Sequence, residues 1–336
     1  MNRHRVLIIG VGSIGERHAR CMLRTGRASV GLCEPDAALR DAVAAKHEIT
    51  ESFAALDEAL DKAWDSAVVA TPAPFHIDIA CRLIEAGIAP LIEKPLAVDD
   101  HGVEDLIDAV HASGRPAGVA YVYRSHPAII AIRDALQGGD CGRPLQVVVN
   151  SGQHFPTYRP AYASTYYREH AAGGGAIQDA LTHWFNCVEW LVGPTTRIAV
   201  DADHLALPKV EVEDTVHAIA RNGSVMTAYT LSQHQPANEH TVTVTCERAQ
   251  KVFDLHHHRW RTMTEPDTPW QTYDTAFTER DDWFTHQESL WLDAIEGKRE
   301  VQCSVIDAAQ TLRTNRAALR SAETGGAWQN IQEIPR

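Results

Sequence analysis

The most constraining feature of the sequence is a glycine pattern directly behind a short apolar run. The run Val6–Ile9 is followed by Gly10, Gly12 and Gly15, and a helical stretch, Glu16–Leu23, comes next. The first glycine permits a tight turn, the second lets backbone approach a pyrophosphate, and the third lets helix and strand pack closely. The segment therefore predicts a βαβ unit and a dinucleotide site that includes Gly10, Gly12, Ser13, Ile14 and Gly15.

Strand-like and helix-like stretches alternate from this motif to about residue 120. Such alternation implies right-handed βαβ units, and hence an α/β domain with a doubly wound parallel sheet of the Rossmann type. The predicted strands are Val6–Ile9, Ser29–Cys33, Ser66–Ala70, Ile88–Ile92 and Pro116–Ala120, and the predicted helices include Ala37–Lys46, Ile77–Ala86 and Val103–Ala112.

Glu34 stands at the end of the second strand, where a carboxylate can accept hydrogen bonds from an adenosine ribose. Its charge would repel a 2′-phosphate, so the sequence favours NAD over NADP. Arg40 follows about a turn and a half later and could serve a phosphate, which leaves the choice of cofactor open to test.

Composition narrows the classes of protein to consider. A chain of 336 residues suits two domains better than one core. Its net charge of −13 argues against nucleic acid and anionic membranes as partners, and no stretch is long and apolar enough for a membrane helix. Seven scattered cysteines indicate free thiols, so we expect a cytoplasmic protein. The run His256–His258 would alternate faces on a strand, so no metal site is predicted.

Three further motifs carry a family resemblance. Thr71–His76 and Glu93–Pro95 follow strand-like runs, and the triplet Gly173–Gly175 precedes Asp179 and His183. In this order, behind the first glycine pattern, they resemble the glucose-fructose oxidoreductase, inositol dehydrogenase and rhizopine catabolism family, abbreviated Gfo/Idh/MocA. The stretch from Asp282 to Ala322 also resembles the family's closing helices. In one departure, the family's frequent Asp three residues after the histidine is replaced by Asn186.

The resemblance implies an NAD-dependent oxidoreductase that acts on a sugar, an inositol or a related polyol. It also implies a second α+β domain with a mostly antiparallel, open-faced sheet, through which the chain forms a homo-oligomer, a dimer or a tetramer. We expect a cofactor domain over 1–122, a substrate domain over 123–304, and a helix over 305–322 that packs back on the first domain. The further cofactor contacts implied are Thr71, Pro72, His76, Glu93 and Lys94.

The second half of the sequence agrees with a sheet domain. Residues Arg221–Ser224 contain an Asn-Gly pair, which favours a two-residue hairpin. The predicted strands are Leu145–Ser151, Arg197–Asp203, Thr215–Arg221, Ser224–Ser232, Thr241–Glu247 and Gln250–His256.

Alcohol oxidation needs a base near the hydroxyl that loses its proton, since the cofactor takes only the hydride. Lys94 would follow a strand at the edge where open α/β sheets bind ligands, with Glu93 beside it as a supporting partner. Asp179 and His183 are four residues apart, so they share one face of a helix. We predict Lys94, Asp179 and His183 as the catalytic set, and either Lys94 or His183 as the group that transfers the proton.

Polar and aromatic residues near the predicted domain boundary and before the glycine triplet suit a sugar ring. Arg159, Tyr166 and Tyr167 belong to the second of these groups, although the tyrosines could equally be core or interface residues. The predicted substrate contacts are Tyr121, Arg124, Tyr158, Arg168, Asp179 and His183.

Two other functions use the same features. NAD-dependent glycoside cleavage would need the same three residues for a transient oxidation. A regulator that binds NAD without chemistry would not need them, so Lys94, Asp179 and His183 argue against it.

Overall fold

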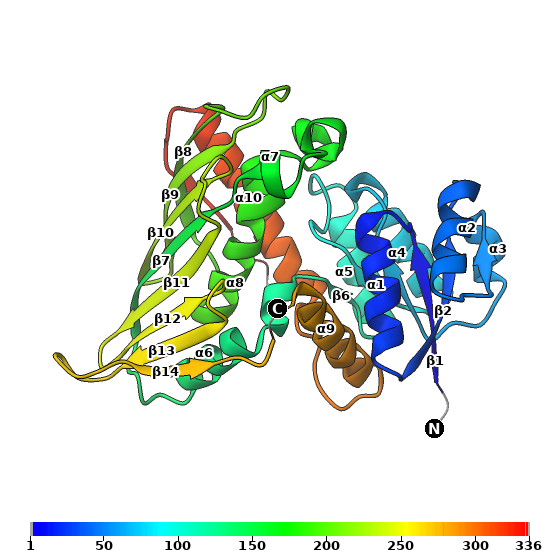
Figure 1. Cartoon of the computed structure of the whole chain (residues 1–336), viewed down its shortest axis with the longest axis horizontal. Coiled ribbons are helices and arrows are strands. Elements are labelled where there is room, and N and C mark those ends of the chain that lie inside the picture. The colour runs from blue at the N-terminus through cyan, green and yellow to red at the C-terminus, as the bar shows by residue number, and fades with distance from the viewer. Residues whose placement is uncertain (1–2, 278, 333, 335–336) are drawn as a thin grey trace. The chain divides into compact units, whose positions relative to one another are not determined.

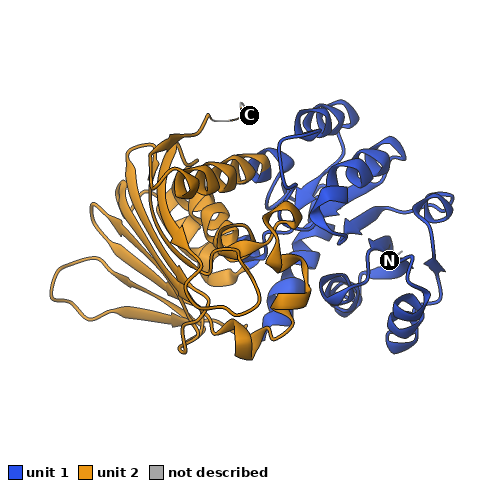
Figure 2. Cartoon of the chain, turned by 90° about the horizontal axis from the view of Figure 1, so that it is seen from above, with its two compact units in different colours: residues 1–125, 279–308 blue, residues 126–278, 309–336 orange. Residues whose placement is uncertain are grey.

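The computed structural model describes residues 3–277, 279–332 and 334. Contacts between Cα atoms divide the chain into two compact units, which Figure 2 shows in two colours. Unit 1 comprises Met1–Ser125 and Glu279–Ala308, and unit 2 comprises His126–Thr278 and Ala309–Arg336. Each unit is thus built from two separate stretches of sequence.

Among the described residues, unit 1 contains a six-stranded sheet in the order β3-β2-β1-β4-β5-β6. All neighbouring strands are parallel, so their carboxyl ends lie at one edge. The order reverses at β1, and the loops behind β1 and β4 flank this switch point, where such sheets bind ligands. The predicted doubly wound domain is therefore confirmed. The strands are β1 His4–Ile9, β2 Ala28–Cys33, β3 Ser52–Phe53, β4 Ser66–Val69, β5 Ala89–Ile92 and β6 Gly118–Val119.

The helices of unit 1 are α1 Ser13–Arg24, α2 Ala37–Lys46, α3 Leu56–Leu60, η1 Ala73–Phe75, α4 His76–Glu85, α5 Val103–Ser113, η2 Val122–Ser125 and α9 Arg280–Ile295. Both faces of the sheet are covered. Val6 and Ile8 of β1 belong to one apolar cluster with Met22 of α1 and Trp291 of α9. The residues between them point to the opposite face and are also buried. This double burial explains why the central strands β1, β4 and β5 contain continuous apolar runs.

Unit 2 contains, within the described part of the chain, a nine-stranded sheet in the order β14-β13-β12-β11-β7-β10-β9-β8-β15. It is mostly antiparallel, although β7 and β10 run parallel. Along β9, Val216 and Ala218 are buried whereas His217 and Ile219 are exposed, so one face of the sheet is open, as predicted. The strands are β7 Pro144–Gly152, β8 Arg197–Asp203, β9 Thr215–Asn222, β10 Val225–Ser232, β11 Glu239–Cys246, β12 Gln250–Asp254, β13 Arg259–Met263, β14 Gln271–Asp274 and β15 Gln329–Asn330.

The predicted hairpin connects β9 to β10, but its two turn residues are Gly223 and Ser224, because Asn222 is the last residue of β9. Asn222 pairs with Val225, and Gly223 has a φ of 57°, a left-handed conformation that suits this turn. The turn sets a register in which alternate residues of both strands point to the covered face.

Helices cover the other face of the unit 2 sheet, as Figure 1 shows for α8 and the greater part of α10. Trp184 of α8 donates a hydrogen bond to Ser151 of β7, and Ser321 of α10 accepts one from the Val200 amide of β8. The helices of this unit are α6 Pro127–Gln137, α7 Phe155–Tyr158, η3 Tyr162–Ser164, η4 Tyr166–Arg168, η5 His170–Ala172, η6 Ile177–Leu181, α8 Thr182–Val192 and, from Ala309 onward, α10 Val305–Glu323.

The two closing helices differ from the expected arrangement. We expected 305–322 to pack on the first domain, but it is α9 that does so, and α10 belongs to unit 2 beyond Ala308. The reason lies in buried polar groups: Thr311 and Thr314 of α10 donate to the carboxylate of Glu189 on α8 at 2.6 and 2.7 Å. The division near the predicted boundary at 122 falls at Ser125.

Candidate functional site

The glycine loop joins β1 to α1 at the carboxyl edge of the parallel sheet. Gly10 has a φ of 81°, and a Cβ at that position would lie 2.8 Å from the carbonyl oxygen of Ala70. A Cβ on Gly15 would overlap the carbonyl oxygen of Gly10, so only glycine fits there. Gly12, in contrast, has open space where a Cβ would project. The loop is therefore closely packed on its inner side and open to a ligand at Gly12.

The surroundings of this loop fit a dinucleotide. Gly12 precedes α1 without a side-chain cap, so the first amide groups of the helix and its positive dipole end suit a phosphate. Ser13 is exposed and Ile14 is half-buried at the same helix start. Thr71, directly behind β4, has a buried Oγ1 with no hydrogen-bond partner within the described residues. A hydroxyl in that state is suited to a bound cofactor.

Glu34 braces the glycine loop from the end of β2. Its carboxylate accepts hydrogen bonds from the backbone amides of Val11 and Asp36, each at 3.0 Å. Arg40 donates to the Glu34 carbonyl oxygen at 2.9 Å. Each carboxylate oxygen has a second lone pair, so the predicted contact with ribose hydroxyls is compatible with this arrangement.

Lys94 is half-buried directly behind β5, at the same edge of the sheet as the glycine loop. The carboxylate of Glu93 accepts a hydrogen bond from the Lys94 backbone amide at 3.0 Å, and the Lys94–Pro95 peptide bond is cis. His76 lies between two loops, with its ring nitrogens 2.8 Å from the Thr71 carbonyl oxygen and 2.9 Å from that of Pro95.

Glu93 and His76 are 5% and 1% exposed, so both side chains point into the protein. Their observed contacts brace the loops behind β4 and β5. Their predicted direct contact with the cofactor, like that of the exposed Pro72, stays a prediction.

Asp179 and His183 lie on consecutive helical segments of unit 2, as predicted. Asp179 belongs to the π-helical turn η6 and is 3% exposed, whereas the half-buried His183 is the second residue of α8. Single π-helical turns occur frequently at functional sites. Residues four apart stay near one face through such a turn, so the chain presents both side chains from one stretch of helix.

The glycine triplet is held by Glu213, which is 7% exposed. Its carboxylate accepts from the Ile177 amide at 2.8 Å and lies 2.5 Å from Nε2 of His170. This hydrogen bond raises the pKa of His170 against the opposing effect of burial. Gly175 has a φ of 88°, and a Cβ there would lie 2.6 Å from the Glu213 carboxylate. Glu213 thus fixes the start of the π-helical turn.

The Asp179 carboxylate has two partners from the polar-aromatic segment before the triplet. The hydroxyl of Tyr166 donates to Oδ1 at 2.6 Å, and the guanidinium of Arg159 lies 3.7 Å from Oδ2. Both partners are exposed residues. The sequence favours Tyr158, which is 51% exposed, and Arg168, which pairs with the adjacent glutamate. The contacts to Asp179 therefore make Tyr166 and Arg159 the better candidates in this segment.

Asn186 has a structural position. It is fully buried, and its side-chain amide donates to the Thr311 hydroxyl at 2.9 Å, which in turn donates to Glu189. The residue that departs from the family pattern therefore connects α8 to α10.

Arg124 is also engaged inside its unit. It is 2% exposed, and its guanidinium lies 3.0 Å from Asp307 and donates to the Gln302 carbonyl oxygen at 3.1 Å. These contacts anchor the first turn of α10 and the segment that precedes it. A contact between Arg124 and substrate stays a prediction.

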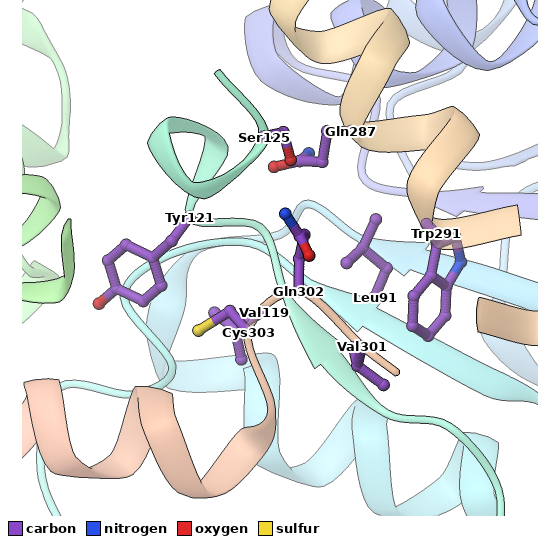
Figure 3. A pocket seen from close by; sticks show the side chains of 9 residues that line it. All are labelled: Leu91, Val119, Tyr121, Ser125, Gln287, Trp291, Val301, Gln302 and Cys303. Atoms are coloured by element: carbon purple, nitrogen blue, oxygen red, sulfur yellow. The ribbon is translucent and has the colours of Figure 1, made fainter. Parts of the chain in front are cut away.

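Figure 3 shows a small cavity of unit 1 in which Ser125, Gln287 and Gln302 direct polar groups toward one another. Its volume of about 20 Å³ is too small for a sugar and suits a single water molecule. Tyr121, which is 2% exposed, contributes to the wall. The predicted contact of Tyr121 with substrate therefore does not arise from this cavity and stays a prediction.

Metal sites and membrane-spanning helices can be assessed for the described residues alone. No group of three or more His, Cys, Asp or Glu side chains there could hold a metal ion. The His256–His258 run lies in the turn between β12 and β13, where His257 contacts Asp254 at 2.7 Å. None of the described helices is long and apolar enough to cross a membrane.

Comparison with known proteins connects both units to one family. Residues 4–121 match the Gfo/Idh/MocA family model described as an oxidoreductase family with an NAD-binding Rossmann fold, and residues 129–251 match the model of that family's C-terminal domain. The chain belongs to the Gfo/Idh/MocA family. The resemblance carried by the four motifs is thereby confirmed, and the glycine loop and Glu34 lie in the part matched to the NAD-binding model.

Individual relatives are more distant. Inositol 2-dehydrogenase of Leifsonia xyli subsp. xyli is 30% identical over 58% of this chain and 56% of its own length. The 1,5-anhydro-D-fructose reductase of Ensifer adhaerens is 27% identical over 62% and 63%, respectively. The chain thus matches little more than half the length of its first relatives. The solved structure of levoglucosan dehydrogenase in complex with NADH aligns with a TM-score of 0.90 over 99% of this chain and all of that one, at 20% identity. This likeness shows the shared fold.

Proposed function

We propose that this protein is an NAD-dependent oxidoreductase that interconverts a hydroxyl and a carbonyl group on a sugar, an inositol or a related polyol. The observation that carries the proposal is the edge of the unit 1 sheet, where the open glycine loop and Lys94 follow strands of one parallel sheet. Family membership supports the same chemistry, because its named relatives include inositol 2-dehydrogenase and 1,5-anhydro-D-fructose reductase.

We assign the chemistry on the substrate to Lys94, Asp179 and His183. When bound, NAD supplies the hydride acceptor, and the protein must hold the substrate oxygen and take up its proton. A lysine ammonium can hold that oxygen, and a neutral imidazole can accept its proton. Asp179, held by Tyr166 and Arg159, orients the polar groups of the sugar or the imidazole. Either Lys94 or His183 transfers the proton.

Lys94→Ala and His183→Ala should each lower kcat by about a hundredfold or more, because loss of a positioned proton-transfer group typically costs 10²–10⁴ in rate. NAD affinity should change by less than about fivefold, since the phosphates bind elsewhere in this proposal. NADH formation is measured across a panel of sugars and polyols, and NAD affinity by calorimetry. The exposed residues Lys62 and His111 supply the controls Lys62→Ala and His111→Ala.

Wild-type turnover in either catalytic variant would remove that residue from the mechanism. Failure of every substrate with both NAD and NADP would overturn the proposed oxidoreductase. Release of p-nitrophenol from aryl glycosides without NADH accumulation would point instead to glycoside cleavage by transient oxidation.

The open face of the unit 2 sheet supports a homo-oligomer. Val148, Ala228 and Ile219 are cross-strand neighbours on β7, β10 and β9, and Val148 and Ile219 are 37% and 52% exposed. Met226 on the same face is 54% exposed. An apolar row on an open sheet is suited to burial against a second copy. We propose a dimer or tetramer formed through this face, in a reducing compartment such as the cytoplasm, where the free thiols persist.

A further inference from the structure

A histidine of α1 is buried between two carboxylates of unit 1. His18 is fully buried, with Nδ1 at 2.5 Å from Oε1 of Glu288 on α9 and Nε2 at 2.7 Å from Oε1 of Glu93 behind β5. Glu288 is also fully buried, and Glu93 is 5% exposed. Phe284 of α9 packs edge-on against the imidazole at 5.5 Å. Two ionisable side chains therefore meet His18 in a setting closed to solvent.

The two carboxyl contacts favour a protonated His18. A neutral imidazole has one donor and one acceptor nitrogen, so it would direct a lone pair at one of the two carboxylates. An imidazolium donates to both, and each charged hydrogen bond is strong at low dielectric. Burial lowers the pKa of His18, but the charges and hydrogen bonds of Glu288 and Glu93 outweigh it and raise the pKa to about 10. We therefore expect His18 to keep its proton throughout the physiological range.

Glu93, which contacts His18, also contacts the backbone of Lys94. One carboxylate oxygen of Glu93 contacts His18, and the other accepts from the Lys94 amide at 3.0 Å. The Glu93 amide donates to the Val69 carbonyl oxygen at 2.8 Å, which ties the same residue to β4. Both ends of Glu93 are thus fixed, and the next residue along the chain is Lys94.

We propose that three buried side chains in contact, Glu288, His18 and Glu93, position Lys94; we call this set the relay. Through it, α1 and α9 would fix the position of the proposed catalytic lysine behind β5. His18 and Glu288 are positioning residues, because they act on Lys94 through Glu93. The inference rests on the proposed function of Lys94 and adds to it a dependence on a proton held far from solvent. The relay places one imidazole between two buried carboxyl groups.

Other titratable and charged groups lie near His18, Glu93 and Glu288. Burial raises the pKa of the Glu93 carboxyl, but the hydrogen bond and charge of His18 outweigh burial, and the charge of Lys94 lowers that pKa further. Cys21 is on the next turn of α1, and burial raises the pKa of its thiol to about 11, so it stays neutral. Burial lowers the pKa of His76, whose charge Glu93 would favour. Arg17 and Asp281 pair on the outer side of α1 and α9.

The first test reads the proton directly. The chain has 18 histidines, and a His18→Gln variant identifies the His18 signals in the nitrogen NMR spectrum of protein labelled at histidine. We expect one imidazole to keep both nitrogens protonated from about pH 5 to about pH 9, where an unperturbed histidine would lose its proton near pH 6.5. A His18 that titrates below about pH 7 would overturn the relay.

The second test separates positioning from stability. Glu288→Gln keeps a hydrogen-bond acceptor for His18 but removes a charge, so the His18 pKa falls and the imidazolium is lost as pH rises. We expect kcat to drop about tenfold near pH 9 and much less near pH 6, with KM for NAD changed by less than about threefold. Ser66→Ala is the matched control, because it removes a buried hydrogen bond to Trp291, one turn beyond Glu288 on α9.

The outcomes distinguish this inference from the proposed function. If Lys94→Ala keeps wild-type turnover, the proposed role of Lys94 fails, and the relay has nothing catalytic to position. If Lys94→Ala is inactive but Glu288→Gln shows the same pH profile as Ser66→Ala at equal loss of Tm, the relay is structural and the inference is overturned. His18→Gln serves the kinetic comparison only if it folds, whereas Glu288→Gln retains the relay's shape.

Discussion

Glu34 connects cofactor choice to the shape of the glycine loop, because one carboxylate meets both the loop and the place expected for the ribose. Its hydrogen bond to the Val11 amide holds the loop, and its charge faces any group bound beyond β2. Arg40, the residue that could favour a phosphate, already donates to the Glu34 carbonyl oxygen. We therefore propose that the balance between these two side chains sets the preference for NAD over NADP.

We expect NAD to bind at least about tenfold more tightly than NADP, because a 2′-phosphate would meet the Glu34 carboxylate at short range. Glu34→Gln keeps an acceptor for the Val11 amide but removes the charge, so the ratio should narrow to less than about threefold. Calorimetric titration of both cofactors measures it. Arg40→Ala should leave the wild-type ratio unchanged or larger. Equal affinities of the wild type for NAD and NADP would show that Glu34 does not discriminate between the two cofactors at the ribose.

Tyr166 offers a test of the Asp179 site that leaves the carboxylate itself intact. Tyr166→Phe removes the 2.6 Å hydrogen bond to Asp179, and we expect kcat/KM to fall about fivefold to fiftyfold, as for one lost charged hydrogen bond. Tyr162→Phe is the matched control, since it removes a hydrogen bond to the Pro208 carbonyl oxygen in the same segment. Equal activity in both variants would show that the hydrogen bond from Tyr166 to Asp179 does not contribute to activity.

Sequence motifs could suggest candidate site residues that stand beside glycines or strand ends, but they could not suggest candidates that depend on contacts between distant parts of the chain. Lys94, Asp179 and His183 belong to local patterns, so the sequence could select them. His18 and Glu288 contact each other across 270 positions of sequence, and a single sequence has no local signal for such a pair. The contacts of Tyr166 and Arg159 with Asp179 were not visible in the sequence for the same reason, because the orientation of that segment depends on tertiary packing. Substrate contacts by Tyr158 and Arg168 stay a prediction.

At the scale of elements, the π-helical turn η6 depends on the loop before it. Gly175 has a left-handed φ, and the Glu213 carboxylate fills the space where its Cβ would stand while accepting the Ile177 amide. A side chain at this position must displace Glu213 as well as strain the backbone. The placement of Asp179 is thus controlled from the glycine triplet.

Gly175→Ala should lower Tm and kcat together, because it adds a clash with Glu213 to a backbone strain of about 1–2 kcal/mol. Gly139→Ala separates the two effects, since Gly139 also has a positive φ, 80°, but a Cβ there would meet nothing within 4 Å. We expect the larger Tm loss, and the only large kcat loss of the pair, in Gly175→Ala. Thermal unfolding and NADH formation provide the measurements, and equal Tm losses would exclude the Glu213 clash.

Helices and strands were predicted correctly where their hydrophobic pattern extends over several residues. The prediction failed where contacts with distant residues determine how an element packs. The central strands of the parallel sheet contain apolar runs, and the residues of β9 alternate between buried and exposed, so both kinds of strand were visible in the sequence. The two-residue strands β3 and β15 are too short to show a pattern, and β14 is exposed along its whole length. The packing of α10 against unit 2 depends on Glu189 of α8, which accepts a hydrogen bond from Thr311. The Ala and Leu spacing of α10 could not reveal this acceptor.

At the scale of the whole molecule, the unit 2 sheet has one covered and one open face, and the open face carries the apolar row of Val148, Ala228 and Ile219. Along this row Ala228 pairs with Val148 on one side and with Ile219 on the other. Three adjacent strands thus present aliphatic side chains at one level of the sheet. Burial of such a row contributes about 25 cal/mol for each Å² of apolar surface removed from water.

The double variant Val148→Asp and Ile219→Asp should convert the proposed dimer or tetramer into single chains, because each interface would bury unpaired carboxylates. Light scattering coupled to gel filtration measures the mass, and circular dichroism checks that both units remain folded. Leu205→Asp is the matched control: Leu205 is 66% exposed, but it lies in a loop rather than on the sheet face. A wild-type protein that elutes as a single chain, or a double variant with wild-type mass, would contradict assembly through this face. Dissociation by Leu205→Asp alone would place the interface at the loop that follows β8.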